Sequence, residues 1–219
     1  AIEAWGPGRD NVIHGNLIYD SGTDQFDLQS GIYLDDATDH FTVTNNIIYG
    51  IHGKGGDQCI YTKGIGNRIE NNILIVDPTN VSAIRSLFMA DERCDHHVYT
   101  KNIIYCQGDD ARKSGRFMYD FNNWSDDRVE LSDYNLFFHP AGEIRFKGKT
   151  VGGTLDVWRK ALNGKFDQNS LVADPLFVDP ANRNYALKPD SPALKIGFKA
   201  IETDRIGLKE DFPSRLKKP

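Results

Sequence analysis

Cysteine is scarce in this chain, which has only Cys59, Cys94 and Cys106 among its 219 residues. Three cysteines are too few, and odd in number, for a disulfide framework, so we expect buried free thiols, with one disulfide plus a spare thiol as the alternative. No apolar run approaches the roughly 20 residues of a transmembrane helix. No charged segment followed by an apolar stretch opens the chain either. We therefore predict a soluble chain without a membrane partner.

Basic residues are also in the minority, because 26 Lys and Arg face 31 Asp and Glu. The chain lacks the excess of positive charge that an extended nucleic-acid-binding surface requires, so we expect no nucleic-acid partner. The sequence lacks a P-loop, a nucleophile-elbow serine and a dinucleotide fingerprint. Residues 91–97 contain metal-ligand types without the spacing of a zinc or EF-hand motif, so we interpret them as a polar corner loop and predict no metal site.

What the sequence does contain is a repeat. An Asn followed by three apolar residues recurs at positions 16–19, 46–49, 72–75, 102–105 and 135–138, with spacings of 30, 26, 30 and 33 residues. A β-branched or alternating stretch precedes each occurrence, which is typical of a strand, a corner and a second strand.

A second series runs between the members of the first. It comprises residues 2–5, 32–35, 60–63, 87–90, 117–120 and, more weakly, 144–147. Two interleaved series with one elastic period predict a single coil repeated with loops at its corners. The segments are too short for a helical solenoid, so we predict an all-β fold, a right-handed parallel β-helix of about five coils. Its corner asparagines are then expected to form a structural column up the stack.

The period ends near residue 150. Thr154 is placed to cap a short helix through Leu162, and Pro-punctuated extended segments follow at 174–180 and 185–194. We predict coils over 1–150 and a C-terminal helix with an extended cap over 151–219 of the same domain, closing the open end of the stack. The first strand begins without a capping segment. This favours the C-terminal part of a longer protein, completed by an N-terminal β-helix portion or a second chain.

Several motifs carry a resemblance over nearly the whole chain. They are Gly-Ile-Tyr-Leu-Asp-Asp at 31–36, the recurring Asn-Asn-Ile-Ile-Tyr, and the segments 172–180 and 187–194. Together they resemble secreted bacterial β-helix proteins of the pectate-lyase-like superfamily. The resemblance implies a secreted or periplasmic carbohydrate-active protein. Because such relatives include glycoside hydrolases, polysaccharide lyases and epimerases, it leaves the reaction open.

Alternation along the second series places one set of side chains outside. The expected outward columns are Glu3, Tyr33, Tyr61, Phe88, Met118, Arg145 and Trp5, Asp35, Lys63, Ala90, Asp120, Lys147. Aromatic rings beside carboxylates suit a sugar, whose C–H face lies on a ring and whose hydroxyl groups bond to charged groups. We therefore predict that Trp5, Tyr33, Tyr61, Lys63 and His52 bind a polysaccharide or oligosaccharide. The alternative is a satellite core, with these rings covered by loops.

Glycoside hydrolysis requires two carboxyl groups that flank the scissile bond. Asp35 or Asp36 is the expected first carboxylate, with Glu3 or Asp91 as its partner. Glu3 and Asp35 lie one coil and two residues apart, or roughly 8 Å between backbones, and Asp91 lies roughly 10 Å away on the same spacing. Equally, Asp35 and Asp36 are typical turn-forming residues. We predict a glycoside hydrolase that acts on a plant or algal polysaccharide without a cofactor.

Two other functions remain open. A polysaccharide lyase would use Lys63 or Arg85 with Ca²⁺ held by acidic turns. A non-catalytic module would bind a glycan through the aromatic face, tolerating loss of Asp35 and Asp36 but not of Trp5 or Tyr33.

Overall fold

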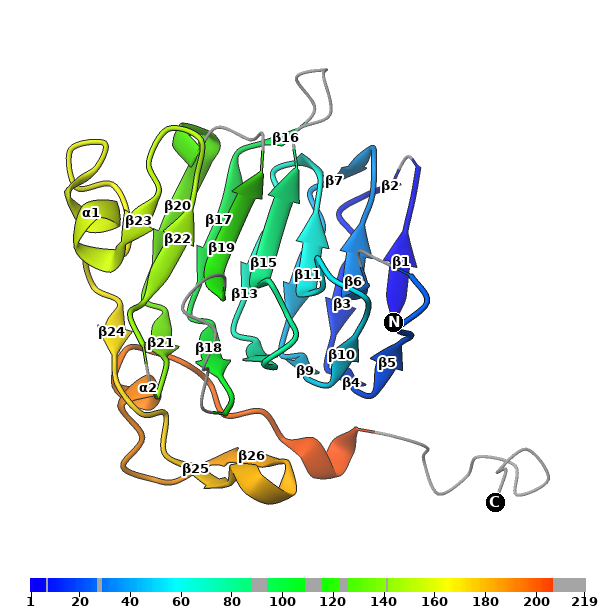
Figure 1. Ribbon diagram of the computed structural model, residues 1–219, viewed down its shortest axis with the longest axis vertical. Coiled ribbons are helices and arrows are strands. Elements are labelled where there is room, and N and C mark those ends of the chain that lie inside the picture. The colour runs from blue at the N-terminus through cyan, green and yellow to red at the C-terminus, as the bar shows by residue number, and fades with distance from the viewer. Residues whose placement is uncertain are drawn as a thin grey trace.

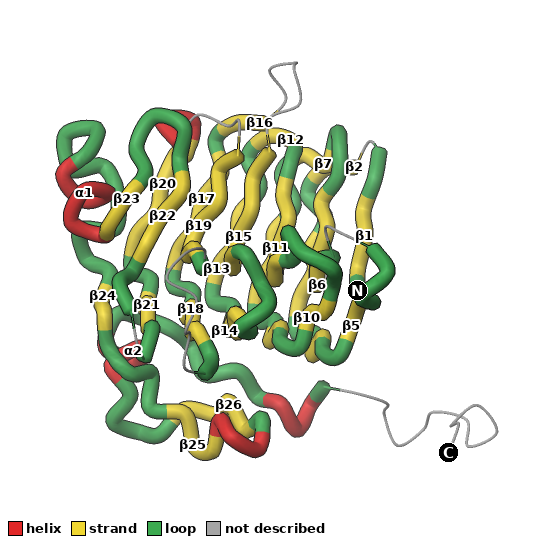
Figure 2. The backbone as a smooth tube through the Cα atoms, viewed as in Figure 1, coloured by secondary structure: helices red, strands yellow, loops and turns green. Residues whose placement is uncertain are grey.

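The computed structural model is a parallel β-helix of about four turns (Figure 1), close to the five coils predicted. It describes residues 1–6, 8–26, 29–87, 94–108, 116–122, 126–140 and 142–206. In this part of the chain the strands dominate and the helices are short (Figure 2). No described helix has the length and apolar character needed to cross a membrane.

Three stacked sheets form the walls of the solenoid. Sheet 1 contains β1 (Ile2–Ala4), β6 (Ser30–Leu34), β11 (Gln58–Thr62), β15 (Ser82–Leu87), β19 (Phe117–Asn122), β22 (Arg145–Lys147) and β23 (Gly153–Thr154). Sheet 2 contains β3 (Val12–His14), β8 (Thr42–Thr44), β13 (Arg68–Glu70), β17 (His97–Thr100) and β20 (Val129–Asp133). Sheet 3 contains β4 (Leu17–Ile18), β9 (Ile47–Ile48), β14 (Ile73–Val76), β18 (Ile103–Cys106), β21 (Leu136–Phe138) and β24 (Leu171–Val172).

Shorter elements lie at the corners and beyond the last coil. The paired short strands are β2 (Gly8–Arg9) with β7 (Thr38–Asp39), β5 (Ser21–Gly22) with β10 (Ile51–His52), β12 (Gly64–Ile65) with β16 (Cys94–Asp95), and β25 (Phe177–Asp179) with β26 (Asn184–Leu187). The helices are α1 (Leu155–Lys160) and α2 (Pro192–Lys195), with 3-10 turns η1 (Asp126–Arg128), η2 (Pro180–Asn182) and η3 (Thr203–Arg205).

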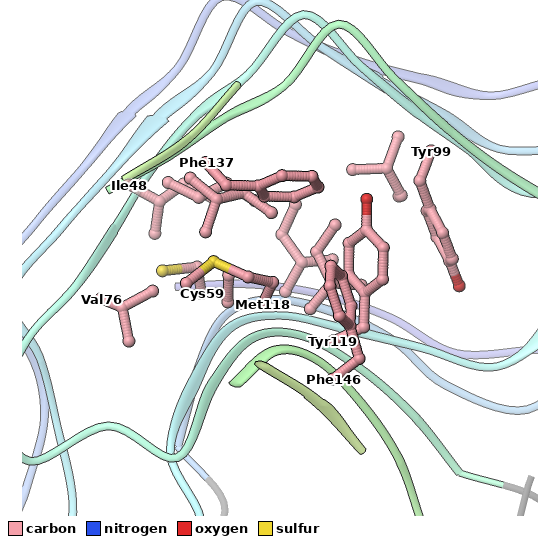
Figure 3. Packing of buried hydrophobic residues seen from close by; sticks show 14 of the residues in the cluster. Ile48, Cys59, Val76, Tyr99, Met118, Tyr119, Phe137 and Phe146 are labelled. Atoms are coloured by element: carbon pink, nitrogen blue, oxygen red, sulfur yellow. The ribbon is translucent and has the colours of Figure 1, made fainter. Parts of the chain in front are cut away.

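Equivalent side chains from successive coils form columns because strand pairing within the stack is parallel and in register. The inward column of sheet 1 is Ile2, Ile32, Ile60, Ile84, Tyr119 and Phe146. From Ile32 onward these side chains are at most 2% exposed. Towards the C-terminal end the column changes from aliphatic to aromatic, and the rings of Tyr99, Tyr119 and Phe146 gather in the interior (Figure 3).

The register of the fourth and fifth coils differs from the prediction. Ile84 pairs with Ile60, and Tyr119 pairs with Ile84, so Leu87 and Phe117 do not occupy the positions expected for them. Met118, expected outside, is fully buried in the core. Equivalent positions Ile60 and Ile84 are only 24 residues apart, which is shorter than the other spacings, and the prediction mistook the apolar run 87–90 for the next strand of the series. Phe88, Met89 and Ala90 lie outside the described residues.

The predicted asparagine column is confirmed at the corner between sheets 2 and 3. The amide groups of Asn16, Asn46, Asn72, Asn102 and Asn135 bond in sequence, with Nδ2 to Oδ1 distances of 2.9, 3.0, 3.1 and 3.2 Å. From Asn46 onward, each Oδ1 also accepts the backbone N–H of the preceding asparagine in the ladder. The residue before each asparagine has positive φ, which turns the chain sharply at the corner.

The C-terminal region has two parts, a helix at the end of the solenoid and an extended segment along its side. Helix α1 covers the last coil, where the buried ring of Trp158 stacks on Phe146 at 4.7 Å and on Phe166 at 4.3 Å between centroids. The Pro-punctuated segment was expected to close the same end, but it runs back along the outside of sheet 3 towards the first coils (Figure 1). Lys199 there exchanges backbone hydrogen bonds with the side chain of Asn71.

The three cysteines are buried thiols that are not joined in a disulfide, as expected from their number. Burial raises the pKa of Cys59 well above its usual range and that of Cys94 to about 12. Such thiols stay protonated and pack as small apolar groups.

Substitution of a central ladder asparagine should destabilise the fold more than substitution of the terminal one. Asn72 is fully buried and bonds to Asn46 and Asn102. Asn72→Ala leaves several buried polar groups without a hydrogen-bond partner and should lower the free energy of unfolding by about 3 kcal/mol or more. Asn16, at the end of the ladder, donates to Asn46 alone among the ladder residues, and Asn16→Ala should cost about 1 kcal/mol. Urea unfolding of both variants measures the difference. Equal losses would contradict a cooperative ladder.

Candidate functional site

The outward face of sheet 1 carries the predicted site residues in a corrected order. Pairing of the strands produces one outward column, Glu3, Tyr33, Tyr61, Arg85, Asp120 and Lys147. Just beyond the strands, backbone bonds continue the ladder from Asp35 to Ala4 and from Lys63 to Leu34. Trp5, Asp35 and Lys63 therefore form a second, shorter column beside the first. Arg85 and Asp120 replace Phe88 and Met118 of the predicted arrangement.

Two carboxylates converge on one ammonium group at the end of β6 and β11. The Nζ of Lys63 donates to Oδ1 of Asp35 at 2.6 Å and lies 3.3 Å from Oδ1 of Asp36. The side chains of Lys63 and Asp35 are 9% and 19% exposed, whereas that of Asp36 is 57% exposed. Asp35 is thus held in the cluster, and Asp36 presents its carboxylate to solvent.

The charged forms of this cluster stabilise each other. Partial burial opposes ionisation of Asp35, but hydrogen bonds from Lys63 and Tyr33 outweigh burial and lower the pKa of Asp35 below its usual value. Burial likewise favours the neutral amine of Lys63, but its bond to Asp35 and its interaction with Tyr33 raise the pKa of Lys63. At neutral pH the pair is therefore a carboxylate and an ammonium ion.

The aromatic part of the site is a stacked pair beside this cluster. The rings of Tyr33 and Tyr61 are nearly parallel, with centroids 4.7 Å apart. Lys63 lies 5.5 and 5.8 Å from the two ring centroids, and the Arg85 guanidinium lies 5.6 Å from that of Tyr61. Tyr61 is only 3% exposed and supports Tyr33, which is half-buried. The open aromatic surface therefore belongs to Tyr33 and to Trp5, which is 77% exposed.

A second charged cluster continues the column on β15, β19 and β22. Asp120 is 1% exposed, and its Oδ1 lies 3.2 Å from Nζ of Lys147. Its Oδ2 lies 4.0 Å from Nε of Arg85. A carboxylate between two cations is tolerated in a buried position because its charge is compensated.

Several buried polar atoms on these strands make no hydrogen bond with the described residues. They include Nε of Arg85, Oε1 of Gln58 and Oγ of Ser82. Buried polar atoms without partners cost free energy, and protein binding sites often contain them because a ligand satisfies them.

The remaining predicted residues are dispersed. Glu3 is exposed on the edge strand β1, one strand from Tyr33. His52 lies on β10, which leads into the start of β11, whereas Lys63 follows the end of β11, so His52 is apart from the carboxylate cluster. His52 instead lies 3.9 Å from Asp20. Asp91 lies outside the described residues.

Sequence reasoning missed the cluster of Arg85, Asp120 and Lys147 because it misplaced the register. A signal was present, since the start of each strand repeats a polar residue, a small residue and Ile. The three occurrences are residues 30–32, 58–60 and 82–84. Aligning on this triplet places Arg85 beside Tyr61 directly.

The residues described do not form a cluster of three or more His, Cys, Asp or Glu side chains that would hold a metal ion. His97, in the predicted corner loop, is fully buried beside Gly64 and Tyr99. Burial lowers its pKa to about 4, so it is neutral at physiological pH.

Comparison with known proteins gives little further information. No family model matches the chain, and no solved structure matches it. An uncharacterized protein of Bacillus subtilis (strain 168), YwoF, is 29% identical over 194 residues. This match covers 85% of the chain but 38% of that protein, so the chain spans less than half the length of this curated relative.

Replacement of Lys63 should remove a stabilisation that depends on the charge of Asp35. We expect Lys63→Met to lower the free energy of unfolding at pH 7 by about 1 kcal/mol, a modest value because the cluster is partly exposed. The pKa of Asp35 is depressed in the folded state, so its contribution is present above its unfolded value of 3.8 and disappears as pH falls through the folded pKa.

Urea unfolding measures the free energy of unfolding of wild type and Lys63→Met. The two proteins should differ at pH 7, and the difference should shrink towards zero at pH 2.5. Lys188→Met, at an exposed lysine, is the matched control and should show no such change. A difference that persists undiminished at pH 2.5 would show that the ion pair is not its cause.

Proposed function

We propose that the chain is a glycoside hydrolase that binds a polysaccharide or oligosaccharide on the outward face of sheet 1. The observation that carries the proposal is the convergence of Asp35 and Asp36 on Lys63, 2.6 and 3.3 Å from its Nζ, beside the partly open ring of Tyr33. Carboxylates, an ammonium group and an aromatic surface are the groups that a pyranose uses for binding. Its C–H face lies on a ring and its hydroxyl groups bond to the charged groups.

Two carboxyl groups on adjacent strands then perform the hydrolysis. Asp35 is ionised at neutral pH because of its lowered pKa, and it takes the role of base or of charge stabiliser, with the more exposed Asp36 beside it. Glu3 lies one strand away, and the strand spacing and rise place the Glu3 and Asp35 backbones about 8 Å apart. Carboxyl groups about 5 to 9.5 Å apart flank a glycosidic bond in hydrolases. In the proposed step a water molecule bonds to the anomeric carbon and gives up a proton on the Asp35 side, while Glu3 is the acid that gives a proton to the leaving oxygen as the glycosidic bond breaks.

The substrate class also suggests where the protein acts. Polysaccharides of plants and algae are too large to enter a cell intact, so we infer a secreted or periplasmic location. A bacterial source follows from the resemblance noted above and is supported by the Bacillus subtilis relative.

A non-catalytic glycan-binding module is the second candidate. The observation in its favour is that both aspartates are already ion-paired with Lys63, an arrangement that also serves to stabilise the end of the strands. A polysaccharide lyase is less well supported, because the raised pKa of Lys63 opposes its use as a base.

Product analysis separates these functions. The chain is incubated with plant and algal polysaccharides, and the products are examined by mass spectrometry. We expect products that have gained water, whereas unsaturated products would indicate a lyase. Binding without any product would favour the module.

Substitutions then test the carboxylates. Asp35→Asn and Glu3→Gln should lower turnover by about a hundredfold or more, the usual contribution of a general acid or base. Asp190→Asn, at an exposed aspartate of the C-terminal segment, is the matched control and should leave turnover unchanged. Trp5→Ala should weaken glycan binding about fivefold through loss of about 1 kcal/mol of ring contact. Undiminished turnover in both carboxyl variants would remove the proposed mechanism.

A further inference from the structure

The chain turns from sheet 1 into sheet 2 at residues 63–67, and this corner carries Lys63. Two fully buried side chains hold the corner from the interior. The side-chain amide of Asn67 donates to the carbonyl oxygen of Lys63. His97 occupies the equivalent position one coil further, and its Nε2 lies 2.9 Å from the carbonyl oxygen of Gly64. The backbone carbonyls of both Lys63 and Gly64 are therefore anchored inside the solenoid.

The same corner also locates the carboxylates of the preceding coil. Gly64 has a φ of +76°, and a Cβ there would lie 2.3 Å from the carbonyl oxygen of Thr38, so the two corners are in direct contact. Thr38 in turn donates from its backbone N–H and from Oγ1 to the carbonyl oxygen of Asp35, at 3.3 and 2.6 Å. The corner that carries Lys63 and the corner that carries Asp35 and Asp36 are thus packed as one unit.

Hydrogen bonding determines the protonation state of His97. A carbonyl oxygen only accepts, so Nε2 carries the proton that bonds to Gly64. Nδ1 is then an acceptor, and the hydroxyl group of Tyr99, 3.1 Å away, donates to it. The oxygen of Tyr99 in turn accepts from Oγ of Ser86 at 2.9 Å. This buried chain of hydrogen bonds requires a neutral imidazole ring.

A second proton on the ring conflicts with this chain. Placed on Nδ1 of His97, it points at the hydroxyl hydrogen of Tyr99, so the hydroxyl groups of Tyr99 and Ser86 must reverse their direction. The added charge also lies in a completely buried ring, and burying a charge costs free energy. Protonation of His97 is therefore unfavourable while the corner stays closed.

Burial dominates the titration of this ring. It lowers the pKa of His97 to about 4, against the carboxylates of Asp95 and Asp39, which favour the charged form. The thiol of Cys94, whose Sγ lies 3.8 Å from Nε2, is neutral because burial raises its pKa to about 12. The titratable groups around the ring are those of Cys94, Tyr99, Asp95, His96 and Asp39. The ring is thus neutral at pH 7 and takes up its proton as pH falls through the folded pKa.

From this geometry, we infer that His97 is a positioning residue of the candidate site. Its neutral ring holds the carbonyl of Gly64, and through it Lys63 and Asp35, and its protonation releases that corner. A buried imidazolium gains free energy when water reaches it, so acid favours an open corner in which the Lys63 ammonium group no longer meets both carboxylates. A regulatory effect on a reaction depends on the proposed function, whereas the effect on the Lys63 cluster does not.

Titration by NMR tests the positioning role in the whole chain. His97→Gln keeps an N–H donor near the position of Nε2 and takes up no proton in this pH range, whereas His97→Leu has no donor. His96→Gln, at the exposed neighbouring histidine, is the matched control. The ring of His97, the backbone amides of Lys63 and Gly64 and the carboxyl carbon of Asp35 are followed from pH 7 to pH 2.5.

In wild type and in His96→Gln, we expect the amides of Lys63 and Gly64 to shift together with the His97 ring, with a midpoint at about pH 4. His97→Gln should lose this phase and keep those of the aspartates. In His97→Leu the pKa of Asp35 should rise towards 3.8, because Lys63 is no longer held against it. Amides that do not follow the ring, a phase that persists in His97→Gln, or an unchanged pKa of Asp35 in folded His97→Leu would overturn the inference. If His97→Leu does not fold, the first two outcomes decide.

The pH profile of turnover tests the regulatory effect. Half of the rings are protonated at the midpoint, so at pH 4 wild type should keep about half the fraction of its pH 7 turnover that His97→Gln keeps. Identical profiles for two active proteins would overturn the regulatory effect. If neither protein turns over a polysaccharide, the proposed function fails, and the NMR titration still decides whether His97 positions Lys63.

Discussion

Parallel, in-register stacking of the coils is the constraint on which the rest of this structure depends. A strand of two to six residues has no stability of its own, and its backbone groups are satisfied only by the coil before and the coil after. The asparagine ladder extends this pairing through the corner between sheets 2 and 3, where the backbone turns and cannot pair regularly. Because Asn46, Asn72, Asn102 and Asn135 are fully buried, each corner is held at the spacing that the sheets require.

The same spacing determines which side chains are compatible on the outer face. Neighbours in a column lie about 4.8 Å apart, so each must tolerate the next. In sheet 1, Tyr33 stacks on Tyr61, Tyr61 lies beside the Arg85 guanidinium, and Asp120 lies between Arg85 and Lys147. These contacts stabilise the stack and also assemble aromatic and charged groups in one strip. The residues proposed to bind a glycan are therefore also residues that stabilise the stack.

The C-terminal segment adds a second layer to one side of the solenoid. It covers sheet 3 with Phe177 and Tyr185, whose rings contact those of Tyr105 and Tyr49. Lys199 fastens it to Asn71, whose positive φ marks the corner of the coil. Sheet 1 is left without this cover, so the face that carries Asp36 and Trp5 remains open over the first coils.

By itself, the sequence determined the solenoid, its period and the buried asparagine column. The reason is that short β segments repeated at a regular period bury their apolar side chains by stacking successive coils in parallel. It also determined the proximity of Asp35 and Lys63, which follow equivalent strands of adjacent coils. Only the tertiary structure decided the register of the fourth and fifth coils, and with it the positions of Arg85 and Asp120. The physical reason is that loops of variable length at the corners shift the local period, so the three-residue difference between Ile84 and Leu87 is settled by packing in the core. The course of residues 173–206 was likewise decided by contacts with sheet 3, between residues far apart in the chain.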